Sequence, residues 1–190
     1  INLILNIMNT LKDKIVLITG GASGMGKIMT RLMLERDATV IIWDIDDVKM
    51  QETVTEFSSI GSIYGYKVDI SEIDQIKNTA EKVQQEIGVV DVLINNAGII
   101  VGKYFHEHST VEISKTMEIN TNAAMHITAQ FLPDMMNQNS GNICNIASSG
   151  GLVSNPKMSV YAASKWAMIG WSDSLRLEMK KLKKNVNVTT

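Results

Sequence analysis

The sequence predicts an α/β fold, a doubly wound parallel β-sheet with helices on both of its faces. Two observations lead to this prediction. Short, nearly continuous apolar runs alternate with longer amphipathic stretches, and strands that are buried on both faces are apolar in this continuous way. Strands that alternate with helices build a parallel sheet. Because no internal repeat and no Pro/Gly/Ser-rich linker divides the chain, we expect a single domain over residues 1–190.

Six apolar runs are the expected strands, and each of the first five ends at small or polar residues that favour a turn. The first run is rich in β-branched residues and ends at Gly20-Gly21, and the second ends at Asp44. The third is less apolar and ends at Asp69. The expected strands cover residues 14–19, 38–43, 62–68, 90–94, 142–147 and 186–189.

Five amphipathic stretches between these runs are the expected helices. Ser71 precedes one of them, and Glu72 and Asp74 lie in its first turn, as helix N-termini prefer. We expect each crossover from strand to helix to strand to be right-handed. The expected helices cover residues 24–36, 46–59, 72–87, 110–138 and 157–184.

Composition and charge exclude several classes of protein. Hydrophobic residues make up 45% of the chain and charged residues 20%, which excludes a disordered chain. The formal net charge of -2 provides no basic field, so we expect no nucleic-acid partner. The three histidines lack the clustered ligands of a metal site, and we expect no metal. The single cysteine, Cys144, cannot form an internal disulfide, which favours a reducing, cytoplasmic location.

The first residues of the chain bear on membrane attachment. Residues 1–7 are mainly apolar, but a helix that spans a membrane needs about 20 apolar residues. They show neither the basic region nor the small residues of a signal peptide. We interpret this segment as a packing arm or as sequence that lies ahead of a translation start at Met8. The alternative is the tail of a lost N-terminal hydrophobic anchor, which would associate the protein with a membrane.

A glycine-rich turn follows the first expected strand and opens the first expected helix, with the spacing TGxxxGxG. Glycine permits positive φ and allows backbone N–H groups to approach a phosphate closely, and a helix N-terminus attracts the same anion. The alternative is a plain turn between a strand and a helix. We predict that the turn binds the pyrophosphate of a nucleotide through Gly20, Ser23, Gly24, Met25 and Gly26.

Acidic residues end the second and third expected strands. Asp44 lies 18 positions after Gly26, near where a carboxylate reaches the hydroxyls of the adenosine ribose. A carboxylate there repels the 2′-phosphate of NADP, and residues 41–48 contain no Arg or Lys to attract it. We therefore predict NAD rather than NADP as the cofactor. Asp69 is expected to accept a hydrogen bond from the adenine amino group or to support the pocket; alternatively it caps the loop before Ser71.

Tyr161 and Lys165 are four residues apart in the last expected helix and therefore share one of its faces. Such a pair is usually a surface contact. An ammonium beside a phenol favours the phenolate, however, which makes Tyr161 a candidate acid/base near neutral pH. Ser148 ends the fifth expected strand 13 residues earlier. Ser148 and Tyr161 can therefore converge on one carbonyl above the sheet.

Taken together, these motifs resemble the short-chain dehydrogenase/reductase family over essentially the whole chain. The glycine turn resembles its cofactor motif, Val68-Asp69 resembles its adenine-pocket pair, and residues 95–98 (Asn-Asn-Ala-Gly) resemble its NNAG turn. The family's catalytic residues match Asn120, Ser148, Tyr161 and Lys165. The resemblance implies a Rossmann-like fold and a cofactor site made of Gly20, Ser23, Gly24, Met25, Gly26, Asp44, Asp69, Ile70, Asn96, Ala97, Gly98, Tyr161 and Lys165.

The same resemblance implies an NAD(P)-dependent oxidoreductase that moves a hydride between nicotinamide and an alcohol or ketone. Tyr161 would transfer the proton, and Ser148 would position the substrate oxygen. Lys165 would act on Tyr161 and bind the nicotinamide ribose, and Asn120 would hold a water of a proton relay. The alternative is a catalytically silent nucleotide-binding sensor or scaffold of the same fold. A lyase or epimerase is disfavoured by the TGxxxGxG spacing.

Three further expectations rest on the resemblance. Residues 40–45, 91–99 and 131–135 are similar to the subgroup of retinol and hydroxysteroid dehydrogenases, which implies a lipophilic substrate such as a retinoid, a steroid or another lipid. Family members pair the helices that correspond to 110–138 and 157–184 between subunits, which implies a homodimer or homotetramer. Members also continue into a seventh strand and a substrate lid, so we expect this chain to be incomplete at its C-terminus.

Overall fold

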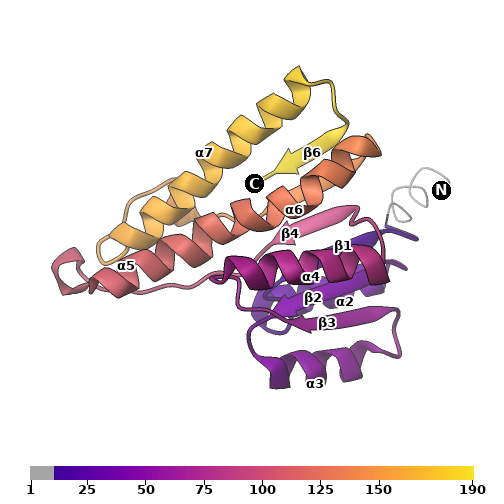
Figure 1. Ribbon diagram of the computed structural model, residues 1–190. Coiled ribbons are helices and arrows are strands. Elements are labelled where there is room, and N and C mark those ends of the chain that lie inside the picture. Colours follow the sequence, from indigo (N-terminus) through magenta and orange to yellow (C-terminus); the bar gives the residue numbers. More distant parts are fainter. Residues whose placement is uncertain (1–10) are drawn as a thin grey trace, which may run out of the picture.

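The computed structural model describes residues 11–190. It contains a six-stranded, fully parallel sheet with the strand order β3-β2-β1-β4-β5-β6, which confirms the predicted fold class (Figure 1). The expected packing arm or anchor at residues 1–7 lies outside the described residues. Within residues 11–190, no helix combines the length and the apolar character that are needed to cross a membrane.

The strands lie within two residues of the predicted boundaries. They are β1 (Ile15–Thr19), β2 (Thr39–Asp44), β3 (Ile63–Lys67), β4 (Val92–Asn95), β5 (Gly141–Asn145) and β6 (Val186–Thr189). From β1, the strands β2 and β3 are added toward one edge of the sheet, and β4, β5 and β6 are then added toward the other edge. The strand order therefore reverses between β1 and β4. Leu17 of β1 pairs with Leu93 of β4 at this point. Ligands of open parallel sheets bind at such a reversal, outside the carboxyl ends of the strands.

The helices lie on both faces of the sheet, as predicted. They are α2 (Gly24–Leu34), α3 (Asp47–Phe57), α4 (Ile73–Glu86), α5 (Thr110–Met117), the π-helical turn η2 (Glu118–Asn122), α6 (Ala123–Asn137) and α7 (Ser159–Lys181). Two short 3-10 turns, η1 (Phe105–Glu107) and η3 (Ser149–Gly151), lie in loops. The α5–η2–α6 rod and α7 lie alongside each other (Figure 1).

Two apolar cores hold these layers together, one on each face of the sheet. Alternate residues of the central strands point to opposite faces, so Leu17 and Ile41 lie in one core while Val16 and Ile18 lie in the other. Side chains of α4, α6 and α7 fill the first core, and side chains of α2 and α3 fill the second. Both faces are covered over β1 and β2, which explains why these strands are apolar except at their end residues Thr19, Thr39 and Asp44.

The helix predicted over residues 110–138 contains a feature that its apolar pattern does not reveal. Residues 118–122 form a π-helical turn between α5 and α6, so the prediction of one regular α-helix is wrong at this turn. A π-turn inserts one extra residue per turn and often occurs at functional sites. Here it buries Asn120 and Thr121, and both side chains bond to Ser164 in α7.

Candidate cofactor and catalytic site

The glycine turn, residues 19–26, connects β1 to α2 and depends on glycine at two positions. Gly20 has a φ of +64°, which disfavours residues with a side chain. A Cβ atom on Gly26 would lie 1.9 Å from the carbonyl oxygen of Gly20. The turn therefore folds back tightly on the first residues of α2, and no side chain fits between them.

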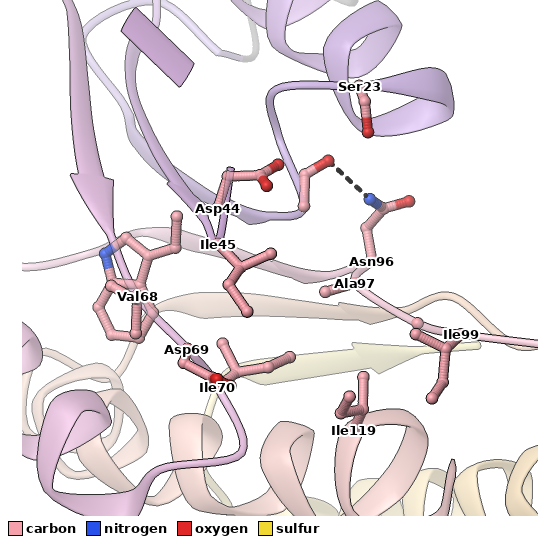
Figure 2. Close-up of a pocket in the computed structure, with 13 residues that line it drawn as sticks. Ser23, Asp44, Ile45, Val68, Asp69, Ile70, Asn96, Ala97, Ile99 and Ile119 are labelled. Carbon is pink, nitrogen blue, oxygen red and sulfur yellow. Dashed lines mark hydrogen bonds between the residues drawn. The ribbon is translucent and has the colours of Figure 1, made fainter. Parts of the chain in front are cut away.

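The N-terminus of α2 is prepared to bind an anion. Ser23 is its N-cap residue, but its side chain makes no capping hydrogen bond, and the first turn contains no acidic residue. The N–H groups of the first turn have no partner within the helix, and they carry partial positive charge. Ser23 lines the neighbouring cleft, and Figure 2 shows its hydroxyl pointing into it. This end of the helix fits a phosphate.

The loop after β4 locks the glycine turn in place. The Nδ2 atom of Asn96 donates to the carbonyl oxygen of Thr19 at 2.9 Å. It also donates to the carbonyl oxygen of Gly20 at 3.3 Å (Figure 2). In return, Oγ1 of Thr19 accepts hydrogen bonds from the backbone N–H groups of Asn96 and Ala97, both at 3.0 Å. These four bonds join the carboxyl ends of β1 and β4, where the strand order reverses.

The carboxylate of Asp44 connects β2 to the same turn. Its Oδ2 atom accepts a hydrogen bond from the N–H of Ala22 at 3.0 Å, and its Oδ1 atom accepts one from the N–H of Asp46 at 3.1 Å. Ile45 follows it and is exposed. A carboxylate has about four acceptor positions, so two remain for a ligand in the cleft that Asp44 lines.

Asp69 caps its own loop and also lines the cleft. Its Oδ1 atom accepts hydrogen bonds from the hydroxyl of Ser71 at 2.6 Å and from the N–H of Ser71 at 3.0 Å. The Ser71 hydroxyl bond is the main cause that lowers the pKa of Asp69, so the carboxylate form is favoured. The capping interpretation is thereby confirmed, and Oδ2 has no hydrogen-bond partner within residues 11–190.

The cleft brings together most of the predicted cofactor residues, from β1, β2, the β3–α4 loop and the β4 loop (Figure 2). Gly24, Met25 and Gly26 are adjacent at the start of α2 but do not line it. Tyr161 and Lys165 also lie outside its lining. Four lining residues were not predicted, namely Trp43, Ile45, Ile99 and Ile119. Each of these four residues is next to a predicted residue in the sequence, but an apolar side chain does not by itself indicate a cofactor site.

Ser148 and Tyr161 lie close together, as the sequence predicts. A Cβ atom on Gly150 would lie 3.2 Å from Cε1 of Tyr161 and 3.5 Å from Oγ of Ser148. Oγ of Ser148 accepts a hydrogen bond from the N–H of Gly150 at 3.1 Å, which leaves its proton free to donate. The glycine at position 150 thus keeps open the space between the Ser148 hydroxyl and the ring of Tyr161.

Lys165 lies next to Tyr161. Its Nζ atom is 5.9 Å from the centre of the Tyr161 ring and donates to the carbonyl oxygen of Ile146 at 2.8 Å. Only 4% of the residue is exposed, and this burial lowers the pKa of the ammonium. A Cβ atom on Gly98 would lie 3.7 Å from this Nζ atom. Lys165 therefore lies between Tyr161 and the end of the cleft formed by the β4 loop.

Asn120 is fully buried and holds the β4 loop. Its Oδ1 atom accepts a hydrogen bond from the N–H of Ile99 at 2.7 Å, and its Nδ2 atom donates to the carbonyl oxygen of Ile99 at 2.9 Å and to Oγ of Ser164 at 3.1 Å. Both amide protons are therefore used within the protein. A relay water at Asn120 stays a prediction, and it would have to bond to the carbonyl groups of this residue.

Other chemistries find little support in this part of the molecule. In the part of the chain that the structure describes, no three His, Cys, Asp or Glu side chains are grouped to hold a metal ion. Cys144 lies on β5, and burial raises the pKa of its thiol, which disfavours the reactive thiolate. The cleft and the Ser148–Tyr161–Lys165 cluster are the chemical features that the geometry singles out.

Comparison with known proteins defines the class. The sequence model of the short chain dehydrogenase family matches residues 14–190. The chain therefore belongs to the short-chain dehydrogenase/reductase family, a family of oxidoreductases, as its motifs predict.

Curated relatives match nearly all of this chain. YvrD of Bacillus subtilis, an uncharacterized oxidoreductase, is 37% identical over 94% of this chain and 66% of its own length. Retinol dehydrogenase 10-A of Danio rerio is 32% identical over 90% of this chain and 58% of its own length. Estradiol 17-beta-dehydrogenase 11 of Homo sapiens is 34% identical over 89% of this chain and 57% of its own length. This chain thus spans less than two thirds of the length of these three relatives.

Solved structures share the fold and contain both forms of the nicotinamide cofactor. A short chain dehydrogenase/reductase from Burkholderia phymatum in complex with NAD has a TM-score of 0.90 and 28% identity, covering 93% of this chain and 64% of that one. A metagenomic short-chain oxidoreductase in complex with NADP has a TM-score of 0.88 and 28% identity, and the match covers 93% of this chain and 80% of that one.

Proposed function

We propose that this chain is the cofactor-binding and catalytic part of an NAD-dependent alcohol dehydrogenase or ketone reductase. The observation that carries the proposal is the approach of Ser148 and Tyr161 to one small space, with the buried Lys165 next to Tyr161. This cluster lies beside the cleft at the carboxyl ends of β1 and β4. Two proton-donating hydroxyl groups next to a nucleotide cleft suit a reaction in which a carbinol and a carbonyl interconvert.

The residues of the cleft fit a dinucleotide. The glycine turn and the uncapped start of α2 would hold the pyrophosphate, and Asp44 would accept hydrogen bonds from the adenosine ribose. Asp69 and Ile70 would border the adenine, and Asn96, Ala97 and Gly98 would support the nicotinamide half. When bound, the cofactor supplies the hydride acceptor or donor of the reaction.

The three polar residues of the cluster would divide the work on the substrate oxygen. Tyr161 would give or take the proton, and Ser148 would donate a hydrogen bond that fixes the oxygen. The charge of Lys165 would favour the phenolate form of Tyr161. Asn120 would keep the β4 loop and the Tyr161–Lys165 turn at a fixed separation through its bonds to Ile99 and Ser164.

The choice of NAD rests on Asp44. Its carboxylate would repel a 2′-phosphate, and its two protein hydrogen bonds to Ala22 and Asp46 hold it at the edge of the cleft. The preference for NAD is therefore expected to be an electrostatic effect, and Asp44→Asn should weaken it.

We propose a lipophilic alcohol or ketone as the substrate. Ile100 follows the β4 loop, and Leu152 and Val153 follow η3; all three side chains are more than half exposed. Gly98 of the first loop lies near Lys165 and Gly150 of the second lies near Ser148 and Tyr161, so these exposed apolar side chains would favour an apolar substrate. Two relatives carry the names of retinol and estradiol enzymes, and both names describe lipophilic alcohols.

We further propose a homodimer or homotetramer formed by the α5–α6 rod and α7. Val111 on α5 and Trp166 and Leu177 on α7 are apolar side chains that are more than half exposed. Light scattering coupled to size-exclusion chromatography would test the assembly, and a monomer at micromolar concentration would contradict it. The cytoplasmic location stays a prediction.

The function is tested by measuring NADH formation by the full-length protein with NAD and a panel of retinol, estradiol and simple secondary alcohols. Tyr161→Phe should abolish turnover and largely spare NADH binding. Tyr64→Phe is the matched control, since Tyr64 lies half-exposed on β3 and does not line the cleft. Turnover that survives in Tyr161→Phe, or tight NAD binding without turnover of any alcohol by the wild type, would contradict the proposal.

A further inference from the structure

Ser164 lies inside the turn that carries Tyr161 and Lys165, and it is fully buried. Its hydroxyl donates to the carbonyl oxygen of Tyr161 at 2.7 Å and accepts a hydrogen bond from Nδ2 of Asn120 at 3.1 Å. A serine hydroxyl has a single proton, so the direction of both bonds is determined. Ser164 thus joins the main chain of Tyr161 to the π-helical turn η2.

A second bond joins the same two elements. Oγ1 of Thr121 donates to the carbonyl oxygen of Ser164 at 2.9 Å. Consecutive residues of η2 therefore hold Ser164 by its side chain and by its main chain. A regular α-helix separates consecutive side chains by about 100°. A π-turn has more residues per turn, so its consecutive side chains differ less in direction, which explains how Asn120 and Thr121 can both reach α7.

The opposite end of this chain of bonds is the cofactor cleft. Asn120 pairs with both the N–H and the carbonyl of Ile99, and Ile99 lines the cleft. A continuous series of hydrogen bonds therefore runs from the cleft through Asn120 and Ser164 to the main chain of Tyr161. Each of these bonds is 3.1 Å or shorter.

We propose that Ser164 is a positioning residue that keeps the Tyr161–Lys165 turn in register with the cofactor cleft. The inference rests on the proposed function, because the register matters only if Tyr161 reacts beside a bound nucleotide. Ser164 touches neither the reacting phenol nor the cleft, and it acts through Asn120 and the carbonyl of Tyr161. A misplacement of about 1 Å can cost a hundredfold in rate.

Helix α7 contains a matched control two turns further along. Ser172 is also buried, its hydroxyl donates to the carbonyl oxygen of Met168 at 2.7 Å, and it accepts a hydrogen bond from Nδ2 of Asn145 at 2.8 Å. Ser164→Ala and Ser172→Ala therefore remove the same kind of hydroxyl and each leaves one buried asparagine proton without a partner. Both should lower Tm by a similar amount, about 3–8 °C.

The kinetic test compares these two variants with the alcohol of the panel that the wild type turns over best. Ser164→Ala should lower kcat roughly tenfold to a hundredfold and change the dissociation constant of NADH less than about threefold, because Asn120 keeps both bonds to Ile99. Ser172→Ala should keep kcat within about twofold at an equal loss of Tm. Ser164→Thr retains a β-hydroxyl that can bond to the preceding turn and should recover part of kcat. Equal kcat values for the two alanine variants would overturn the proposal.

A second measurement does not require turnover. The protein contains four tyrosines, so ring-13C-labelled tyrosine gives an NMR spectrum in which Tyr161→Phe assigns the Tyr161 signal. Ser164→Ala should shift this signal and Ser172→Ala should not. If the wild type oxidises no alcohol, the proposed function fails, and the NMR comparison alone still decides the positioning role. An unmoved Tyr161 signal in a folded Ser164→Ala variant would refute it.

Discussion

The glycine turn and the Tyr161–Lys165 turn lie at the same edge of the sheet, but different atoms hold them. In the glycine turn, neighbouring residues contact mainly the backbone of the turn itself: Nδ2 of Asn96 donates to two carbonyl oxygens, and Gly26 packs directly on the backbone of Gly20. In the Tyr161–Lys165 turn, a side chain of the turn takes part as well, because the buried hydroxyl of Ser164 accepts a hydrogen bond from Asn120, and Thr121 donates to the carbonyl oxygen of Ser164.

This difference determines how each region responds to substitution. A region that is held through its backbone is sensitive wherever a new Cβ atom would collide. A region that is held through buried polar side chains is sensitive wherever a hydroxyl or amide loses its partner. Substitutions in each region test this contrast.

Lys165→Met should separate catalysis from stability most strongly. Methionine approximates the length of the side chain without the charge, so the proposed influence on Tyr161 is lost and kcat should fall by about 10²–10⁴-fold. The unfolding free energy should change by less than about 1 kcal/mol, because replacing a buried charge by an apolar group is often neutral. Stopped-flow kinetics and urea titration measure the two effects. Lys180→Met on the exposed end of α7 is the control, and equal rates for both variants would contradict the role of Lys165.

Gly26→Ala should damage the glycine turn through its backbone. The new Cβ atom would lie 1.9 Å from the carbonyl oxygen of Gly20 and 2.7 Å from Nδ2 of Asn96, so the turn must shift. We expect a loss of about 1–3 kcal/mol in unfolding free energy and at least about a tenfold weaker affinity for NADH, or 1.4 kcal/mol. Fluorescence titration with NADH measures the affinity. Gly102→Ala, where a Cβ meets no atom within 4 Å, should behave as wild type; an equal loss there would refute the steric argument.

These two regions also differ in how far the sequence predicts them. The spacing of glycines, the apolar strand β1 and the acid at Asp44 are local patterns with a direct physical meaning, so the turn, the parallel sheet and the cofactor site could be anticipated. The contacts of Ser164 with Asn120 and Thr121 could not be predicted, because they join residues 44 and 43 positions apart in the sequence. The π-helical turn that orients Asn120 and Thr121 toward α7 is also not indicated by the local sequence. Ser148, Tyr161 and Lys165 were found through spacing and resemblance together.

Thr19→Val should destabilise the glycine turn, because the side chain of Thr19 joins this turn to the loop after β4. Valine has nearly the same shape, but it removes the oxygen that accepts hydrogen bonds from the N–H groups of Asn96 and Ala97. We expect a loss of about 1–3 kcal/mol in unfolding free energy. Hydrogen exchange at these two amides should become faster. Thr55→Val on the exposed face of α3 should cost much less; equal costs would mean that the β4 loop does not depend on Thr19.

The buried charge of Lys165 should appear in the pH dependence of stability. Burial lowers the pKa of its ammonium below 10.5, so between these two values the folded chain binds fewer protons than the unfolded chain. The contribution of Lys165 to stability therefore rises as the pH increases toward 10.5. Relative to Lys165→Met, the wild type should gain stability between pH 7 and pH 10 in urea titrations. A difference that stays constant or moves the other way would contradict a buried, destabilised ammonium.

Gly170→Ala should have the smallest effect, and of the opposite sign to Gly26→Ala. Gly170 lies on the exposed side of α7, and a Cβ atom there meets nothing within 4 Å. Alanine restricts the unfolded chain and favours the helix, so the unfolding free energy should rise by about 1 kcal/mol. Since the helix is held to η2 by Ser164 and not by Gly170, kcat should stay unchanged. A destabilised variant would mean that this face of α7 is covered in the assembled protein, which light scattering of the same sample would reveal.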